Sequence, residues 1–258
     1  MKLSVVIPAR NEEGAVEETV ATLLGTLRAE AIPFEILVVD DGSTDKTAFL
    51  VRALSARYSE IRLVQNTGRH GFGMAVQCGL HEATGDAIAV VMADSSDSPE
   101  DVVKCYRRLL EGPDCVFGSR FIRGSKVHDY PFHKLVLNRL ANWFIKMLFG
   151  VPFNDFTNAF KLYRWEVIEG MQPLISPHFN LTVEMPLKAI IRGYSFAVVP
   201  ISWTNRQTGI SKLKIKEMGS RYLFIILYLW LEKLLARGDY HRRPSTAQHQ
   251  AGFDIRHV

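Results

Sequence analysis

Short apolar runs rich in valine and isoleucine recur along the chain, and longer segments with helical periodicity separate the first five of them. The runs predict strands at residues 3–8, 35–41, 61–66, 87–94, 115–120 and 197–203. The segments between them predict helices at residues 12–28, 46–58, 71–82 and 99–111. Strands that alternate with helices predict an α/β fold with a mostly parallel, Rossmann-like sheet flanked by helices.

The alternation stops after Arg120. A basic and aromatic loop at residues 121–133 precedes predicted helices at residues 134–149 and 181–192. The sequence shows no internal repeat and no low-complexity linker. We therefore expect one domain at residues 1–210, followed by a C-terminal extension.

The extension is basic and apolar. Its apolar run "YLFIILYLWL" at residues 222–231 is shorter than the roughly 20 residues that span a bilayer. Amphipathic helices within residues 211–237 would lie on an anionic membrane surface, or pack against the core, a second copy of the chain or a membrane-embedded partner. Residues 238–258 are polar and lack periodicity, which predicts a disordered tail.

Composition narrows the class of protein. The chain has 258 residues, of which 47% are hydrophobic, and a net charge of +4, so it can bury a full core. Three cysteines without metal-ligand spacing argue against a zinc site and a disulfide framework, and they fit a reducing compartment. The sequence opens on a strand pattern and not on a signal peptide, so we expect a cytoplasmic protein. No nucleic-acid partner is expected.

Four polar stretches follow the first four predicted strands. They are "PARNEE", "DDGSTD", "NTGRHGFG" and "MADSSD". Ligands of open parallel sheets bind at the carboxyl ends of the strands, so these stretches predict one site along one rim. Each stretch contains groups suited to a nucleotide diphosphate.

Two of these stretches allow both a structural and a ligand-binding interpretation. Asp40 and Asp41 end a strand, where a carboxylate can accept hydrogen bonds from a nucleobase or a ribose. The glycines around Arg69 open a helix, where backbone N–H groups could approach a phosphate or could simply form a turn. Asn11 is a candidate cap for the first helix.

The stretch "AIAVVMADSSDSPED" holds the candidate metal ligands. Its end, from Ser98 to Asp101, has the serine, proline and acids that favour a helix start. Asp94 and Asp97 remain as oxygen ligands for a hard divalent cation. On a continuous strand Met92 would point the same way as Asp94, and its thioether is a poor ligand for such a cation.

Seven motifs together resemble a known family. They are "VVIPARNEE", "EILVVDDGSTDKT", "NTGRHGFGMAVQCGLHEATGD", "VMADSSDSPED", "FGSRF", "NDFTNAFKLY" and "WTNRQTGISKLK". Their order and spacing over residues 3–215 resemble family 2 glycosyltransferases of the GT-A fold, most of all dolichyl-phosphate mannose synthases and bacterial polyprenyl-phosphate glycosyltransferases. The resemblance implies inverting transfer of a monosaccharide from a GDP- or UDP-sugar to a polyprenyl phosphate, with Mg²⁺ or Mn²⁺. It also implies peripheral association with the cytosolic face of a membrane.

The resemblance assigns roles residue by residue. The implied nucleotide-binding residues are Pro8, Ala9, Arg10, Glu12, one of Asp40 or Asp41, Arg69, Ala93 and Asp94. The implied acceptor-phosphate residues are Arg120, Lys134, Asn138, Arg206 and Lys212. The implied catalytic residues are Asp94, Arg120, Asp155, Arg206 and Lys212, and the implied metal ligand is Asp94, with Asp97 and Ser96 as helpers.

The sequence departs from the family pattern at four positions. Lys134 and Asn138 stand where the family usually has an arginine and a serine, and Lys161 replaces the arginine of a "TSGFR"-like segment that follows Asp155. Met92 replaces the first carboxylate of the family's Asp-x-Asp motif, so we expect weak metal binding.

Two other functions stay open at this point. Transfer to a hydroxyl acceptor would need a carboxylate base, for which Asp155 and Glu184 are candidates. A catalytically silent protein that only binds a nucleotide sugar is the other, because of Met92. An ionised phosphate acceptor needs no strong base, and the site would instead have to hold two anions together with basic residues.

Overall fold

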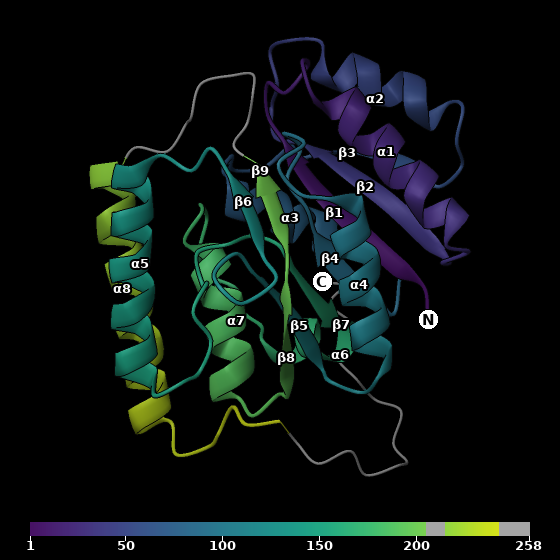
Figure 1. The fold of residues 1–258 in the computed structure, drawn as a ribbon. Coiled ribbons are helices and arrows are strands. Elements are labelled where there is room, and N and C mark those ends of the chain that lie inside the picture. The colour runs from purple at the N-terminus through teal and green to yellow at the C-terminus, as the bar shows by residue number, and fades with distance from the viewer. Residues whose placement is uncertain (205–214, 243–258) are drawn as a thin grey trace.

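The computed structural model describes residues 1–204 and 215–242, with side chains from residue 219 onward in the second range. A seven-stranded sheet has the order β3-β2-β1-β4-β7-β5-β8 (Figure 1). The strands are β1 (Leu3–Ala9), β2 (Phe34–Asp40), β3 (Ile61–Gln65), β4 (Ala87–Val90), β5 (Cys115–Ser119), β7 (Lys161–Arg164) and β8 (Phe196–Pro200). All pairings are parallel except those of β7, which runs antiparallel to both neighbours. The predicted mostly parallel α/β sheet is confirmed.

Helices cover both faces of the sheet because the central strands are apolar on both sides. In β1, Val5 and Ile7 pack under helices α1 and α4, whereas Val6 packs on the other face with α3. The helices of this half are α1 (Val16–Ala29), α2 (Thr47–Ser55), α3 (Phe72–Glu82) and α4 (Pro99–Leu110). This half of the chain therefore follows the predicted alternation of strands and helices.

Two predicted strands have different bounds in the structure, and a further strand of the sheet was not predicted. The strand expected at residues 87–94 ends at Val90, because the Asp97 and Asp94 carboxylates accept backbone N–H groups and turn the chain. Met92 and Asp94 therefore do not share a strand face. Residues 197–203 form two short strands, β8 and β9 (Ser202–Thr204), and β7 was missed because it is short and pairs with strands distant in sequence.

The C-terminal half adds a second group of elements. They are β6 (Lys126–His128), α5 (Phe132–Phe149), α6 (Trp165–Gly170), α7 (Leu181–Ile191) and α8 (Ile215–Leu235). Helix α8 packs on α7 and runs beside α5, at the side of the molecule away from α1 and α2 (Figure 1). Ile225 and Leu229 of α8 join the main core.

Polar contacts hold α8 in this position. Glu232 forms a buried ion pair with Arg192, the residue that follows α7, with Arg192 Nε 2.9 Å from Glu232 Oε1. Lys233 Nζ donates to the carbonyl of Phe149 at the end of α5. Beyond α8, Arg242 pairs with Asp114 at 2.7 Å, so the start of the expected tail is held against the domain. Residues 243–258 lie outside the described residues.

Helices α5 and α8 expose large apolar side chains on their outer sides. Those of α5 are Phe132, Val136, Leu137, Leu140, Trp143, Phe144 and Met147. Those of α8 are Leu223, Phe224, Leu227, Tyr228, Leu231, Leu234 and Leu235. We call these side chains the α5–α8 face. Neither helix has the length and apolarity that crossing a bilayer requires, nor does any other helix in the described part of the chain.

Candidate active site

The loops after β1 and β2 are hydrogen-bonded to each other. The Asn11 N–H donates to Ser43 Oγ (3.0 Å), and the Thr44 N–H donates to Asn11 Oδ1 (2.7 Å). Asn11 therefore links two loops and does not cap the first helix, which begins later at Val16. That expectation was wrong because a partner from another loop, here Thr44, competes for the side chain. These hydrogen bonds hold the two predicted nucleotide-binding stretches together, so the stretches form one continuous rim.

Asp41 organises the next loop of the rim. Its carboxylate accepts hydrogen bonds from Asn66 Nδ2 (2.7 Å) and the Gly71 N–H (2.8 Å), and it contacts His70 Nδ1 (3.2 Å). Among the described residues, the Asp40 carboxylate accepts only the Ser43 N–H, at 3.1 Å. Asp40 therefore keeps more hydrogen-bonding capacity for a ligand than Asp41 does.

The glycines of the glycine-rich stretch allow close packing against residues 176–178. The Gly71 N–H is bound by Asp41, and the Gly73 N–H donates to the carbonyl of Pro177 (3.1 Å). A Cβ atom at Gly73 would lie 2.1 Å from the carbonyl oxygen of Ser176, so only glycine fits there. The turn interpretation is correct for these glycines. Arg69 lies beside them with its side chain exposed.

The loop after β4 carries the predicted metal ligands. The Met92 N–H donates to Asp97 Oδ2 (3.0 Å), and the Ser96 N–H donates to Asp94 Oδ1 (3.2 Å). Thr19 Oγ1 of α1 donates to the carbonyl of Ala93 (3.2 Å). Burial raises the pKa of Asp97 to about 7, and the charge of Asp94 adds to this. The loop thus brings two carboxylates into one electrostatic environment that favours a cation.

These donors suit a hard divalent cation in kind. Carboxylate oxygens are what Mg²⁺ and Mn²⁺ prefer, and Mg²⁺ commonly uses one or two carboxylates together with substrate phosphates and water. Across residues 1–204 and 215–242, no group of three or more histidine, cysteine, aspartate or glutamate side chains is arranged to hold a metal. A metal bound by Asp94 and Asp97 would therefore complete its coordination with diphosphate oxygens and water.

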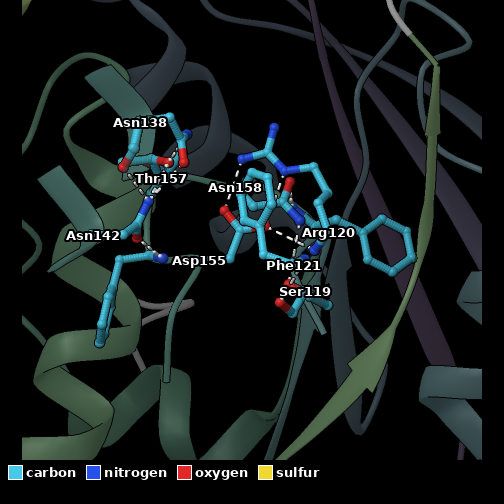
Figure 2. Close-up of polar contacts among 12 residues, drawn as sticks. Ser119, Arg120, Phe121, Asn138, Asn142, Asp155, Thr157 and Asn158 are labelled. Carbon is cyan, nitrogen blue, oxygen red and sulfur yellow. Dashed lines mark hydrogen bonds and ion pairs between the residues drawn. The ribbon is translucent and has the colours of Figure 1, made fainter. Parts of the chain in front are cut away.

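The second part of the site is a buried ion pair between Arg120 and Asp155 (Figure 2). Arg120 Nε donates to Asp155 Oδ2 (2.9 Å) and Arg120 Nη2 to Asp155 Oδ1 (2.8 Å), and the Arg120 backbone N–H also donates to Asp155 Oδ2. The exposed fractions of the two side chains are 7% and 0%. Burial opposes the charge of Arg120, but Asp155 outweighs it and raises the pKa of the guanidinium.

Three aromatic rings surround this arginine. The guanidinium carbon of Arg120 lies 5.4 Å from the ring centre of Phe121, 5.5 Å from that of Tyr130 and 5.7 Å from that of Trp203. These distances are within the range of cation–π attraction. Arg120 is therefore held in a fixed position, with its charge shielded from solvent.

The other residues that the resemblance implies for the acceptor lie on α5 or follow β9 in the sequence. Lys134 and Asn138 lie on α5, and Asn138 Nδ2 donates to Thr157 Oγ1 at 2.6 Å. Strand β9 reaches the loop after β4, because the Thr204 N–H donates to the carbonyl of Ser96 at 3.2 Å. Arg206 and Lys212 follow β9 and lie outside the described residues.

Neither candidate base is available as a base. Asp155 is bound by Arg120 as described above. Glu184 is fully buried in α7, 2.8 Å from Lys188 Nζ, and accepts the N–H groups of Ile175 and Ser176. Both carboxylates are therefore engaged within the protein.

Two buried polar residues were given no role from the sequence. Lys161, at the start of β7, donates from Nζ to the carbonyls of Phe156, Asn158 and Thr182, and burial lowers its pKa to about 7. Asn142 of α5 is 1% exposed and contacts the loop that carries Asp155. A lysine or asparagine within an otherwise apolar segment is the signal that could have pointed to them.

Comparison with known proteins shows the family of the chain. A model of glycosyl transferase family 2 matches residues 4–171. The chain is 32% identical over 215 residues to polyprenol monophosphomannose synthase of Mycolicibacterium smegmatis, covering 81% of this chain and 80% of that protein. It is 33% identical to dolichol-phosphate mannosyltransferase of Pyrococcus furiosus, covering 84% of this chain but 60% of that longer protein.

A solved structure supports the fold. Glucosyl-3-phosphoglycerate synthase of Mycobacterium tuberculosis, in complex with Mn²⁺, UDP and phosphoglyceric acid, superposes with a TM-score of 0.67 at 21% identity. The match covers 90% of this chain and 78% of that one. The fold is that of GT-A glycosyltransferases. The chain belongs to glycosyl transferase family 2 and is a glycosyltransferase.

Proposed function

We propose that this chain transfers a monosaccharide from a nucleotide diphosphate sugar to the phosphate of a polyprenyl lipid, with inversion at the anomeric carbon. The observation that carries the proposal is the state of Asp155 and Glu184, which are both buried and paired with cations. A hydroxyl acceptor would need a base to remove its proton, whereas a phosphate is already ionised near neutral pH. The names of the two relatives, both mannosyl transferases to lipid phosphates, support the same acceptor class.

The nucleoside would lie on the rim formed by the loops after β1 and β2. We assign it to Pro8, Ala9, Arg10, Glu12 and Asp40. Asp40 is preferred over Asp41 because Asp41 already holds Asn66 and the Gly71 N–H. Arg69, exposed on the neighbouring loop, would face the solvent side of the nucleotide.

The diphosphate would lie on the loop after β4, at Ala93 and Asp94. A divalent cation held there would supply positive charge to the leaving diphosphate. The Asp97 carboxylate would take over part of the role of the carboxylate that Met92 replaces. The hydrogen bond from the Met92 N–H holds the Asp97 carboxylate next to that position. Ser96 is buried and is positioned by its bond to Asp94, so it supports the loop.

In the proposed reaction an acceptor phosphate oxygen bonds to the anomeric carbon while the bond from that carbon to the diphosphate breaks. The nucleoside diphosphate leaves with the electron pair, and no proton has to be removed from the acceptor. The main demand is to bring two anions together, which needs fixed positive charge. We assign this role to Lys134, Arg206 and Lys212, together with Arg120.

We also propose that the α5–α8 face lies on the membrane that contains the lipid acceptor. Helix α5 combines this exposed apolar surface with Lys134, Arg139 and Lys146 and has no acidic residue, which suits an anionic bilayer surface. The same helix carries Asn138, which is hydrogen-bonded to Thr157, two residues after Asp155. A lipid phosphate entering from the membrane would therefore approach the acceptor side of the site.

A donor panel tests the function. Purified full-length protein is incubated with UDP- and GDP-sugars, polyprenyl phosphate in vesicles, and Mg²⁺ or Mn²⁺, and nucleoside diphosphate release is measured. We expect release with one donor that depends on the lipid phosphate, and Arg206→Ala should abolish it while donor binding persists. Release that requires a free hydroxyl compound in place of the lipid phosphate would refute the proposed acceptor.

A further inference from the structure

Helix α5 has two sides with different partners. Its outer side belongs to the α5–α8 face, and its inner side turns Asn138 and Asn142 toward residues 154–158 (Figure 2). These five residues, which we call the Asp155 loop, lie between α5 and the end of β5. The loop is therefore the polar connection between the helix and the Arg120–Asp155 pair.

On the helix side, Asn142 uses both ends of its amide. Asn142 Oδ1 accepts the N–H of Phe156, the residue directly after Asp155, at 2.5 Å. Asn142 Nδ2 donates to Asn138 Oδ1 (2.9 Å) and to Thr157 Oγ1 (3.3 Å). Asn138 Nδ2 donates to the same Thr157 oxygen. Asn142 is only 1% exposed, so water cannot replace these hydrogen bonds without a rearrangement of the loop.

On the sheet side, the same loop holds the end of β5. Asp155 binds both the backbone and the side chain of Arg120. Asn154 accepts a hydrogen bond from Ser119 Oγ (2.8 Å) and donates to the carbonyl of Phe121 (3.0 Å). The residues on both sides of Arg120 are thus fixed by the loop that Asn142 fixes.

We propose that Asn142 is a positioning residue for glycosyl transfer, because it sets the Arg120–Asp155 pair from helix α5 through the Asp155 loop. Asn142 does not touch the substrates in this arrangement. The proposal rests on the proposed function only in assigning the Arg120–Asp155 pair to the acceptor side. Its structural part, the connection from Asn142 to Arg120, stands on the contacts above.

Asn180 offers a matched control. It is also a buried asparagine of the C-terminal half, at 3% exposure, and its Nδ2 donates to Ser176 Oγ (2.8 Å) at the start of α7. Its hydrogen bond does not involve the Asp155 loop. Asn142→Ala and Asn180→Ala should therefore both lower stability, whereas only Asn142→Ala should disturb the Arg120–Asp155 pair.

The first measurement is kinetic. For Asn142→Ala we expect kcat for transfer to polyprenyl phosphate to fall about 10- to 100-fold, as for a misplaced catalytic group, with donor affinity by calorimetry within about twofold of wild type. Thr157→Val, which removes the shared hydroxyl acceptor with little change of volume, should lower kcat in the same direction. Asn180→Ala should keep the wild-type kcat per folded molecule. An unchanged kcat in both Asn142→Ala and Thr157→Val would overturn the proposal.

The second measurement needs no acceptor. Amide hydrogen exchange is followed in peptides that cover residues 118–122 and residues 154–158. Asn142→Ala should speed exchange in both peptides, since the Arg120 N–H depends on Asp155. Faster exchange confined to residues 154–158 would refute the connection, even if wild type proved inactive toward lipid phosphates. Wild-type inactivity with every donor would instead refute the proposed function.

Discussion

The Arg28–Glu60 pair of the N-terminal half and the Arg120–Asp155 pair of the C-terminal half are both bidentate, and they lie in opposite environments. In the N-terminal half, Arg28 and Glu60 meet at 2.7 Å with side chains 47% and 25% exposed. In the C-terminal half, Arg120 and Asp155 meet at 2.8 Å with side chains 7% and 0% exposed. An ion pair that is exposed to water contributes little to stability. Removing one partner of a buried ion pair costs much stability, because the other charge is left buried and unpaired. Burial therefore decides which pair the protein depends on.

The largest expected effect comes from breaking each pair by an isosteric change. Asp155→Asn should lower the free energy of unfolding by about 3–5 kcal/mol, because it leaves the Arg120 charge buried without its counter-ion. Glu60→Gln should lower it by less than about 1 kcal/mol, because water solvates Arg28. Urea denaturation measures both. Equal losses in the two variants would contradict the role assigned to burial.

The two halves also differ in their exposed apolar residues. Phe49 on α2 is 69% exposed in the N-terminal half, whereas Trp143 on α5 is 60% exposed within the larger α5–α8 face. Trp143→Glu should weaken binding to anionic vesicles about tenfold or more, since it places a like charge in the apolar contact. Phe49→Glu should leave vesicle binding unchanged. Flotation with vesicles decides this, and equal binding by both variants would refute the assigned membrane face.

Restoring the missing carboxylate sharpens the account of the N-terminal half. Met92→Asp should tighten Mn²⁺ binding about tenfold in the presence of nucleoside diphosphate, because it adds a hard oxygen ligand. Asp97→Asn should weaken it. The control is Asp86→Asn, at the opposite end of β4, where the carboxylate accepts the Lys2 N–H. Calorimetry measures the three affinities, and no gain for Met92→Asp would show that residue 92 does not face the metal.

The last expected effect, spread gradually over pH, is a pH dependence of stability. Burial lowers the pKa of Lys161 from 10.5 to about 7. Between pH 7 and pH 10.5, Lys161 therefore binds its proton more strongly in the unfolded chain than in the folded protein. This contribution makes the folded state more stable as pH rises above 7, by at most about 1.4 kcal/mol per pH unit. Lys161→Met should remove this slope in urea denaturation from pH 7 to 9, and the exposed Lys104→Met should keep it. An unchanged slope in Lys161→Met would contradict the assignment.

Much of the N-terminal half follows from local sequence. The strand and helix periods predicted β1 to β3, α1 to α4 and the shared rim, because those patterns arise between residues close in the chain. The start of α4 at Pro99 was predicted for the same reason. The hydrogen-bond partners of the side chains at the rim could not be predicted in this way. Asn11 was taken for a helix cap, and its bond to Thr44 depends on how two separate loops meet.

The sequence by itself determined the class of fold, the family motifs and the replacement of a carboxylate by Met92. Only the tertiary structure decided that β7 enters the sheet antiparallel, that Arg120 is bound by Asp155 from 35 residues away, and that α5 and α8 lie side by side with large apolar side chains exposed. The hydrophobic period of a strand or helix depends on residues that are close in the sequence. The partners of buried charges and of helix faces depend instead on packing between segments that are distant in the sequence.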